Sequence, residues 1–268
     1  MMSRLSSLVK GHPIVTFFVL SYALAWMLVP FGSFGAYGPL VAALIVVPIT
    51  GGVAGLKELG LRIIRWRVRW YWYAVALGVP LAVHLAVVGL NVARGEGVPS
   101  LAFASLTTFL VVFAIRLVNP TDGPLGENPG WQGFALPGVQ GSGYSPLLAT
   151  AIVAPLVSLW HLPLFFWEPG GLQAPVLVGG LVTTVAATFF YNWLFNRTGG
   201  SVLLVILAHD LEGSIQYEIG WIVMGVWLAV AIGLVVFDLK AWRGSAPDEA
   251  MTPPRATSPK GVTPATSA

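Results

Sequence analysis

Residues 70–90 read WYWYAVALGVPLAVHLAVVGL and contain no Asp, Glu, Lys or Arg. A helix needs about 20 mainly apolar residues to cross the hydrocarbon core of a bilayer. The stretch therefore predicts a transmembrane helix, and similar stretches recur along the chain. We expect an all-α fold, a polytopic bundle of about eight transmembrane helices. The other predicted spans are Ile14 to Pro30, Pro39 to Leu56, Leu101 to Val118, Pro146 to Phe166, Pro175 to Phe195, Trp221 to Phe237 and a weaker one that begins at Ser201.

The overall composition agrees with a membrane protein. Hydrophobic residues make up 56% of the 268 residues, charged residues make up 9%, and the mean hydropathy is +0.79. Soluble domains are about one quarter charged, so this chain has too little polar surface to be one of them. The sequence has no Cys, which excludes disulfides, thiol catalysis and Cys-ligated zinc.

The Lys and Arg residues predict an orientation. Residues 57–69 carry five of the 14 in the chain. With the N-terminus in the cytoplasm and eight spans, only Arg94 lies outside, and Arg116 is interpreted as a structural residue near a cytoplasmic helix end. Cytoplasmic loops are enriched in Lys and Arg, so both termini are expected to be cytoplasmic. The aromatic residues at 66–73 predict an interfacial belt against the lipid bilayer and not a nucleic-acid surface.

The chain divides into two regions. Residues 1–243 are predicted to form the transmembrane domain, with its motif-bearing half at 119–237. Residues 244–268 are rich in Pro, Ser, Thr and Ala without an apolar period, which predicts a disordered cytoplasmic tail. The first span starts like a signal peptide, with Ala23-Leu24-Ala25 as a candidate cleavage site, but the charge pattern favours an uncleaved helix.

Three polar motifs interrupt the apolar pattern of the second half. Residues 126–137 (GENPGWQGFALP) contain Glu127, residues 159–163 (LWHLP) contain His161, and residues 208–214 (AHDLEGS) contain His209. Ionisable groups at membrane depth are costly, so each of them marks a functional site by default. His84, alone in an apolar stretch, is interpreted as a packed histidine of the core.

The first two motifs are placed to meet. Glu127 lies 17 residues before Tyr144 and His161 lies 17 residues after it, and a turn signal surrounds Tyr144. Equal arms of a helical hairpin bring the two side chains to the same depth, where a carboxylate and an imidazole can activate water. The segment around Glu127 is too polar to face lipid, so we expect it to dip into the membrane and line a cavity.

The third motif also indicates polar residues inside the membrane. About eight apolar residues precede His209, which cover roughly 12 Å of a core about 30 Å thick. The polar remainder must face protein or water. His209, Gly213 and Gln216 share one helical face by their spacing.

The order of these motifs resembles the CPBP family, the CAAX-protease and bacteriocin-processing intramembrane endopeptidases. That family has a Glu-Glu-x-x-x-Arg motif, a helix that ends near a His, and a His-x-x-x-Asn motif. Residues 123–137 look like a common bacterial version of the first motif, and residues 160–165 look like the second. The resemblance covers roughly residues 123–213 and implies an integral protein of a bacterial cell membrane.

The resemblance implies a catalytic set of Glu127, His161 and His209. Glu127 corresponds to the general base that deprotonates the attacking water. His161 corresponds to the histidine that holds this water, directly or through a metal, and His209 to the histidine that stabilises the oxyanion.

The sequence departs from the family pattern at three positions. Asn128 stands in place of the second glutamate and Gln132 in place of the arginine, at i and i+4, where two amides can still hydrogen-bond. We interpret this as one coupled exchange of a structural ion pair. Gly213 stands in place of the asparagine, and loss of such a donor costs about 100- to 1000-fold in rate. Gln216 is the candidate substitute, so Asn128, Gln132 and Gln216 are supporting residues.

The leading hypothesis is an intramembrane endopeptidase that cleaves a membrane-associated or lipidated peptide entering from the cytoplasmic leaflet. The cofactor is left open. A divalent metal such as zinc would need Glu127, His161 and His209 as ligands, and Glu127 could then not act as a free base. The alternatives are a catalytically silent relative that binds a membrane partner, and a small-solute transporter that uses the same groups as a proton path.

Overall fold

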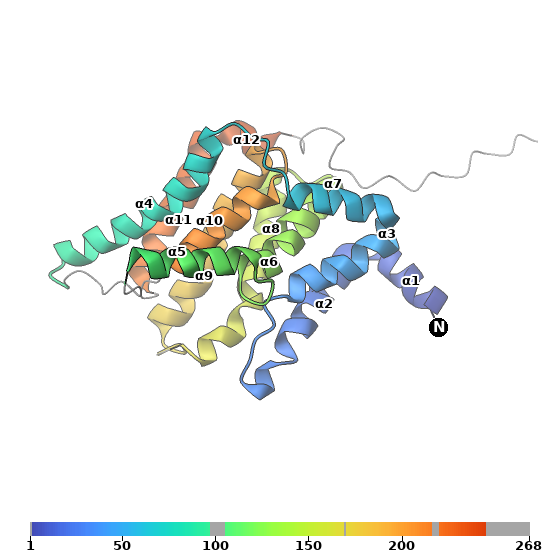
Figure 1. The fold of residues 1–268 in the computed structure, drawn as a ribbon, viewed down its shortest axis with the longest axis horizontal. Helices are drawn as coiled ribbons and strands as arrows, with labels where there is room; N and C mark the ends of the chain where they lie inside the picture. Colours follow the sequence, from blue (N-terminus) through green and yellow to red (C-terminus); the bar gives the residue numbers. More distant parts are fainter. Residues whose placement is uncertain (1, 97–104, 169, 216–219, 245–268) are drawn as a thin grey trace, which may run out of the picture.

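The computed structural model describes residues 2–96, 105–168, 170–215 and 220–244, with side chains from residue 6 onward. Within these ranges the chain forms helices and no strand, which confirms the all-α class (Figure 1). Most of the predicted tail, residues 245–268, lies outside the described residues. The α-helices are α1 (Met2–Gly11), α2 (Pro13–Trp26), α3 (Gly38–Ile63), α4 (Tyr71–Ala93), α5 (Leu106–Val118), α6 (Pro124–Gly130), α7 (Leu136–Gly141), α8 (Pro146–Trp160), α9 (Ala174–Arg197), α10 (Val202–Ser214), α11 (Trp221–Phe237) and α12 (Leu239–Arg243). Short 3-10 helices follow α2 (η1, Val29–Phe31) and α8 (η3, Leu162–Phe166), and a π-helical turn, η2 (Trp131–Ala135), joins α6 to α7.

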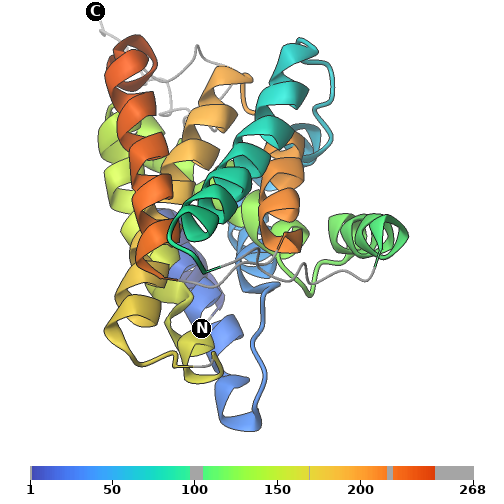
Figure 2. The ribbon, with the colours of Figure 1, turned by 90° about the vertical axis from the view of Figure 1, so that its left-hand side faces the viewer.

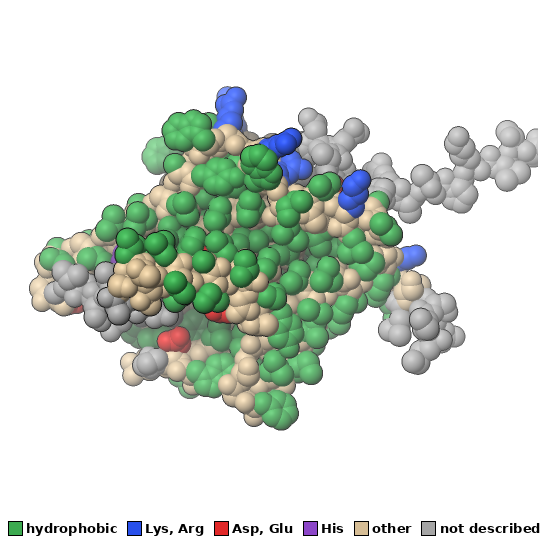
Figure 3. Space-filling model, viewed as in Figure 1, with side chains coloured by type: hydrophobic (Ala, Val, Ile, Leu, Met, Phe, Trp, Pro, Cys, Tyr) green, Lys and Arg blue, Asp and Glu red, His purple; other side chains and the backbone are tan. Residues whose placement is uncertain are grey.

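Each predicted span corresponds to a helix, but their lengths differ. Five helical segments are long and apolar enough to cross a membrane: α2 with η1, α3, α4, α8 with η3, and α9. α5 and α11 are apolar but shorter, and α10 has 13 residues. Large apolar side chains cover the outer surface, among them Val19, Leu85 and Phe237 (Figure 3). The chain is an integral membrane protein. The predicted number of about eight spans is reached only if the shorter helices α5 and α11 and the more polar α10 are counted.

Contacts between helix ends define the basic end of the bundle. The Ser201 hydroxyl, before α10, donates to the Arg65 carbonyl, after α3, at 2.7 Å. Arg197, at the end of α9, lies 5.7 Å from the Trp72 ring at the start of α4 and 3.3 Å from Asp238, after α11. Three connections therefore meet at one end, as the predicted topology requires: the α3–α4 loop, the α9–α10 turn and the segment after α11.

The motif segment forms one continuous helix, which is longer than the short re-entrant or interfacial piece that the sequence predicts. α6, η2 and α7 follow one another without a break over residues 124–141, about 27 Å at 1.5 Å per residue. Its first turn packs at Gly126 against the Ala36 carbonyl, in the connection from α2 to α3. Its last turn packs at Gly138 against Ile14, at the start of α2. The segment thus runs the length of α2, because its polar side chains bond within the protein and need no water-filled surround.

α5 lies at the periphery of the bundle. None of its residues is buried, and it stands apart from the other helices in Figure 2. Arg116, near its end, donates to Asp210 at 3.1 Å and to Asp122 at 3.0 Å, close to the end of α10 and the start of α6. Arg116 is therefore at a different end from residues 57–69, with which the predicted topology had grouped it. It lies away from the basic end, held there by two carboxylates.

Arg62 also departs from its predicted place in a cytoplasmic loop. α3 continues past a kink at Gly52 to Ile63, so Arg62 is helical and buried. Its Nη1 donates to the Gly133 carbonyl at 2.7 Å, and its Nε lies 3.2 Å from Glu58. Gly133 belongs to the π-helical turn, so Arg62 supplies a donor at the point where the motif helix is irregular.

Glycine packing between α3 and the motif helix generates the first prediction. A Cβ atom at Gly130 would lie 2.5 Å from the Pro39 carbonyl oxygen, and backbone cannot move aside as a side chain can. Gly130→Ala is expected to lower the free energy of unfolding by about 1–3 kcal/mol through overpacking. Thermal unfolding in detergent measures this.

Gly78→Ala is the matched control, because Gly78 is exposed in α4 with no atom within 4 Å of a new Cβ. It should leave stability unchanged or raise it by up to about 1 kcal/mol, the helix propensity of Ala over Gly. Equal melting temperatures for both variants would show that this close approach does not hold the motif helix.

Candidate active site

Four helices contribute to one cavity of about 180 Å³. The motif helix supplies its floor, the end of α8 one wall, and α9 and α10 the other walls. The lining residues are Glu127, Asn128, Trp131, Gln132, Val157, His161, Thr183, Thr184, Ala187, Thr188, Tyr191, His209 and Glu212. Glu127, His161 and His209, which the sequence predicts as a set, all face this cavity.

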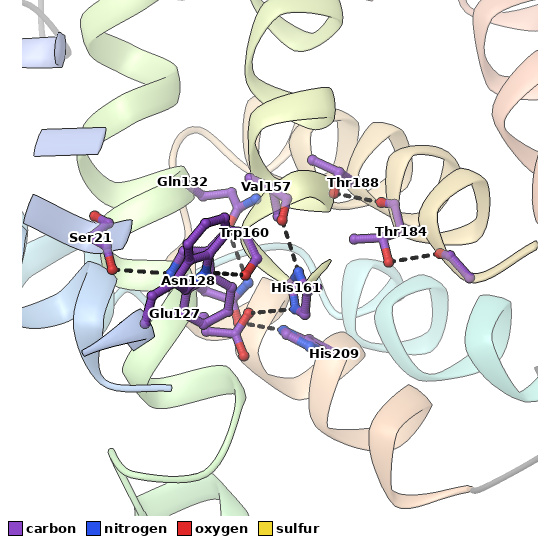
Figure 4. A network of polar contacts seen from close by, with 12 residues as sticks. Ser21, Glu127, Asn128, Gln132, Val157, Trp160, His161, Thr184, Thr188 and His209 are labelled. Atoms are coloured by element: carbon purple, nitrogen blue, oxygen red, sulfur yellow. Dashed lines mark hydrogen bonds and ion pairs between the residues drawn. The ribbon is translucent and has the colours of Figure 1, made fainter. Parts of the chain in front are cut away.

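Glu127 and His161 form the closest ionisable pair in the cavity (Figure 4). Glu127 Oε2 lies 3.5 Å from His161 Nε2, and only 5% of the Glu127 surface is exposed. His161 Nδ1 lies 2.8 Å from the Val157 carbonyl, which can only accept, so Nδ1 carries a hydrogen. A neutral His161 then presents a lone pair to a carboxylate. The two acceptors are satisfied together by a shared proton or by a water molecule that donates to both.

The end of α8 fixes the position of His161. The Trp160 indole donates to the Ser21 carbonyl at 3.1 Å, and the Trp26 indole donates to the Trp160 carbonyl at 2.9 Å (Figure 4). Both partners belong to α2. The Trp160 ring also packs edge-on against Trp131 of the motif helix, with ring centroids 5.5 Å apart. His161 therefore stands on a helix end that two other helices hold.

His209 reaches the cavity from α10. Its Nδ1 lies 3.1 Å from Asn128 Oδ1, and its ring stacks on Tyr191 at 5.2 Å. Its Nε2 takes no part in the bond to Asn128. The imidazole is thus held on one edge and one face.

A series of amides extends from His209 into the core. Asn128 Nδ2 donates to Gln132 Oε1 at 3.0 Å, so the predicted contact between the two amides is present. Gln132 Nε2 donates to Asn192 Oδ1 at 2.9 Å, and Asn192 Nδ2 donates to the Thr150 hydroxyl at 3.2 Å. We call these four residues the amide relay. All four are buried, so each lost partner would leave a polar group unsatisfied.

The amide relay couples to the tautomer of His209. In the direction above, Asn128 accepts from His209 Nδ1–H, which leaves Nε2 as an acceptor. Each amide carries a donor and an acceptor, so reversing all of them preserves every bond, with the Thr150 hydroxyl then donating. Asn128 would donate to Nδ1 in that state, and Nε2 would carry the hydrogen. The relay therefore allows either tautomer of a neutral His209.

Sequence reasoning missed Asn192, Thr150 and Trp131. Asn192 and Thr150 lie in apolar spans, and an amide in such a span was the one available signal for Asn192. Trp131 is 1% exposed, lines the cavity, and has no hydrogen-bond partner for its indole nitrogen among the described residues. Its indole N–H nevertheless lies near enough to act on the Glu127 carboxylate, so this donor is directed at the Glu127–His161 pair.

The position that lacks the family asparagine is filled by a different side chain. A Cβ atom at Gly213 would lie 2.7 Å from Nη2 of Arg116, and one at Gly123 would lie 2.9 Å from the same atom. The Arg116 guanidinium thus lies between two glycines, and an asparagine at 213 would displace it. Gln216, the predicted substitute, lies outside the described residues.

The part of the chain that contains the site matches a known family. Residues 105–211 match the model of the Rce1-like family, described as type II CAAX prenyl endopeptidase Rce1-like. The match confirms the resemblance to the CPBP family. It includes Glu127, His161 and His209 and stops two residues before Gly213. No curated protein matches the chain.

The residues that could hold a metal ion face this cavity. The described residues contain no group of three or more His, Asp or Glu side chains placed to hold one ion. Glu127 faces His161, and His209 Nδ1 is bonded to Asn128, which leaves His209 Nε2 outside that bond. A divalent metal held by Glu127, His161 and His209 stays a prediction.

The amide relay generates the second prediction. Asn192→Leu should shift the ring ¹⁵N signals of His209, because Gln132 and Asn128 lose the partner that orders them. It should also lower the free energy of unfolding by about 1–3 kcal/mol, the cost of an unsatisfied buried amide. Solution NMR of protein labelled at histidine, with His209→Gln for assignment, measures the first effect.

Asn196→Leu is the matched control. Asn196 lies one turn further along α9 and pairs with Gln140 at 3.2 Å, outside the amide relay. Its replacement should leave the His209 signals where they are in the native protein. Unchanged His209 signals in both variants would show that the relay does not reach the histidine.

Proposed function

We propose that this protein is an intramembrane endopeptidase of the CAAX type, which hydrolyses a peptide bond of a membrane-associated or lipidated peptide. The observation that carries the proposal is the buried pair of Glu127 and His161, 3.5 Å apart in a cavity inside the bundle. The Rce1-like match supports the peptidase class. A carboxylate beside an imidazole acceptor is suited to deprotonate water.

In the proposed mechanism, the attacking water lies between Glu127 and His161 and donates one hydrogen to each. Its oxygen attacks the scissile carbonyl while Glu127 takes the proton, and His161 holds the water through Nε2. The C–N bond then breaks as the proton passes from Glu127 to the leaving nitrogen. Water is added across the bond, and no other reactant is consumed.

The negative charge on the carbonyl oxygen needs donors. His209 supplies one when Nε2 carries a hydrogen, and the indole N–H of Trp131, which lies beside the Glu127 carboxylate, is the second candidate. Fixed donors in a water-poor site typically lower a barrier by about 3–4 kcal/mol each. Trp131 would thus take the part for which the family uses an asparagine at the position of Gly213.

A catalytically silent relative that binds a membrane peptide is the second candidate. The observation in its favour is the contact between Gly213 and Arg116, which leaves no room for the family asparagine. Arg116 is already paired with two carboxylates, so it is a weak substitute for a free donor.

We also propose that both termini lie in the cytoplasm of a bacterial cell. The loops of the basic end support this, because Lys and Arg concentrate on the cytoplasmic side of membrane proteins. The start of α2 and the end of α11 both lie at this end.

The third prediction tests the proposed base. Purified protein in nanodiscs should cleave one or more peptides of a panel of membrane-associated and prenylated synthetic peptides. Glu127→Gln should lower the cleavage rate by about 10²- to 10⁴-fold, the usual contribution of a general base. Mass spectrometry of the products measures the rate.

Glu96→Gln is the control, because Glu96 is an exposed carboxylate paired with Arg94 beyond the end of α4. It should cleave at the native rate. A Glu127→Gln protein as fast as the native one would remove Glu127 as the base. Native protein that cleaves none of the panel would favour the silent relative.

A further inference from the structure

We propose that the cavity opens to the non-cytoplasmic side of the membrane and that the scissile bond enters from that side. The statement about the substrate rests on the proposed function, whereas the direction of the opening does not.

Packed apolar side chains close the cavity toward the basic end. α10 begins at the basic end, and Val202 and Val205 precede His209 on it with no exposed surface. Leu194 and Phe195 lie in the last turns of α9, and Leu136 follows the catalytic turn of the motif helix, all likewise fully buried. No path for a peptide leads through such a core, because interiors of this kind are close-packed.

The site residues lie at the opposite ends of their helices. His161 is the residue at which α8 ends, and Glu127 lies in the first turn of α6. Beyond them the chain is exposed: Glu212 and Leu162 are partly exposed, and Glu168 is exposed. Acidic side chains are visible at a recess below α5 in Figure 3. The cavity therefore communicates with the end that lies away from the basic loops.

Charge separates the two ends. Nine of the eleven Lys and Arg side chains that the structure describes belong to segments that form or adjoin the basic end, and six of the eight described Asp and Glu side chains belong to segments nearer the other end. The basic set is Lys10, Lys57, Arg62, Arg65, Arg67, Arg69, Arg197, Lys240 and Arg243. The acidic set is Glu96, Asp122, Glu127, Glu168, Asp210 and Glu212, which share their end with Arg94 and Arg116.

This distribution assigns the sides. Short loops rich in Lys and Arg stay in the cytoplasm, so the basic end is cytoplasmic and the open end faces outward. The endopeptidase hypothesis drawn from the sequence instead expects the substrate to enter from the cytoplasmic leaflet. Because the motif helix runs the length of the bundle, Glu127 lies far from the basic end, and the direction of entry reverses.

The absence of Cys allows a direct test with single thiols. Ser142→Cys and Glu168→Cys place an exposed thiol just before α8 and after η3, and Thr184→Cys places one in the cavity wall. Each full-length variant is expressed in bacterial cells and exposed to a membrane-impermeant maleimide, before and after permeabilisation. Labelling needs no catalysis, so its outcome is independent of whether the protein cleaves peptides.

Glu168→Cys should label in intact cells, Thr184→Cys should label there more slowly, and Ser142→Cys should label only after permeabilisation. Intact-cell labelling of Ser142→Cys with protection of Glu168→Cys would reverse the orientation and overturn the proposal. Labelling of Thr184→Cys only after permeabilisation would also overturn it, since the cavity would then open to the cytoplasm. Glu212→Cys, partly exposed on α10, repeats the cavity measurement if Thr184→Cys does not accumulate.

Discussion

The close approach of the motif helix to α3 is the constraint on which the site depends. A polar helix can be buried among apolar ones only if its backbone is fully bonded and its side chains find partners within the protein. Glycine at 126 and 130 lets the backbones meet at α3 and the connection before it, and Arg62 supplies the donor at the π-helical turn. These contacts fix the depth and rotation of Glu127, and hence the face that it shares with His161.

The amide relay shows how the site tolerates its departures from the family pattern. A buried ion pair carries a large desolvation cost, and losing one member strands a charge, whereas a neutral pair loses neither charge nor partner. Asn128 and Gln132 are such a pair, and Asn192 with Thr150 extends it into α9 and α8. The cost falls on His209, because a neutral amide does not favour a charged imidazole as a carboxylate would. The exchange of the ion pair for two amides therefore preserves the packing of the motif helix. What it changes is the electrostatic environment of His209, the proposed oxyanion donor.

Hydropathy predicted the helices well and their roles unevenly. The length of the apolar stretches located nearly every helix, because long apolar stretches mark helices that are exposed to lipid. For the same reason hydropathy misjudged where α5 and the motif helix lie. α5 is apolar but peripheral, whereas the motif helix is polar but central. The meeting of Glu127, His161 and His209 was predictable from motif order and arm length. The roles of Arg62, Arg116 and Asn192 were not, because each has a partner far away in sequence: Gly133, Asp210 and Gln132, respectively.

The direction of the cavity also determines how water, the second reactant of any hydrolysis, reaches the pair. Along α9 the hydroxyl of Thr184 donates to the Gly180 carbonyl at 3.0 Å, and that of Thr188 donates to the Thr184 carbonyl at 2.7 Å (Figure 4). Their hydrogens are thus used within the helix, and their oxygens keep lone pairs that face the cavity. Water that enters from the open end meets a row of acceptors, which orients its hydrogens toward α9. A peptide that fills the entrance would exclude further water and leave the bound molecule between Glu127 and His161, where the low dielectric strengthens each interaction.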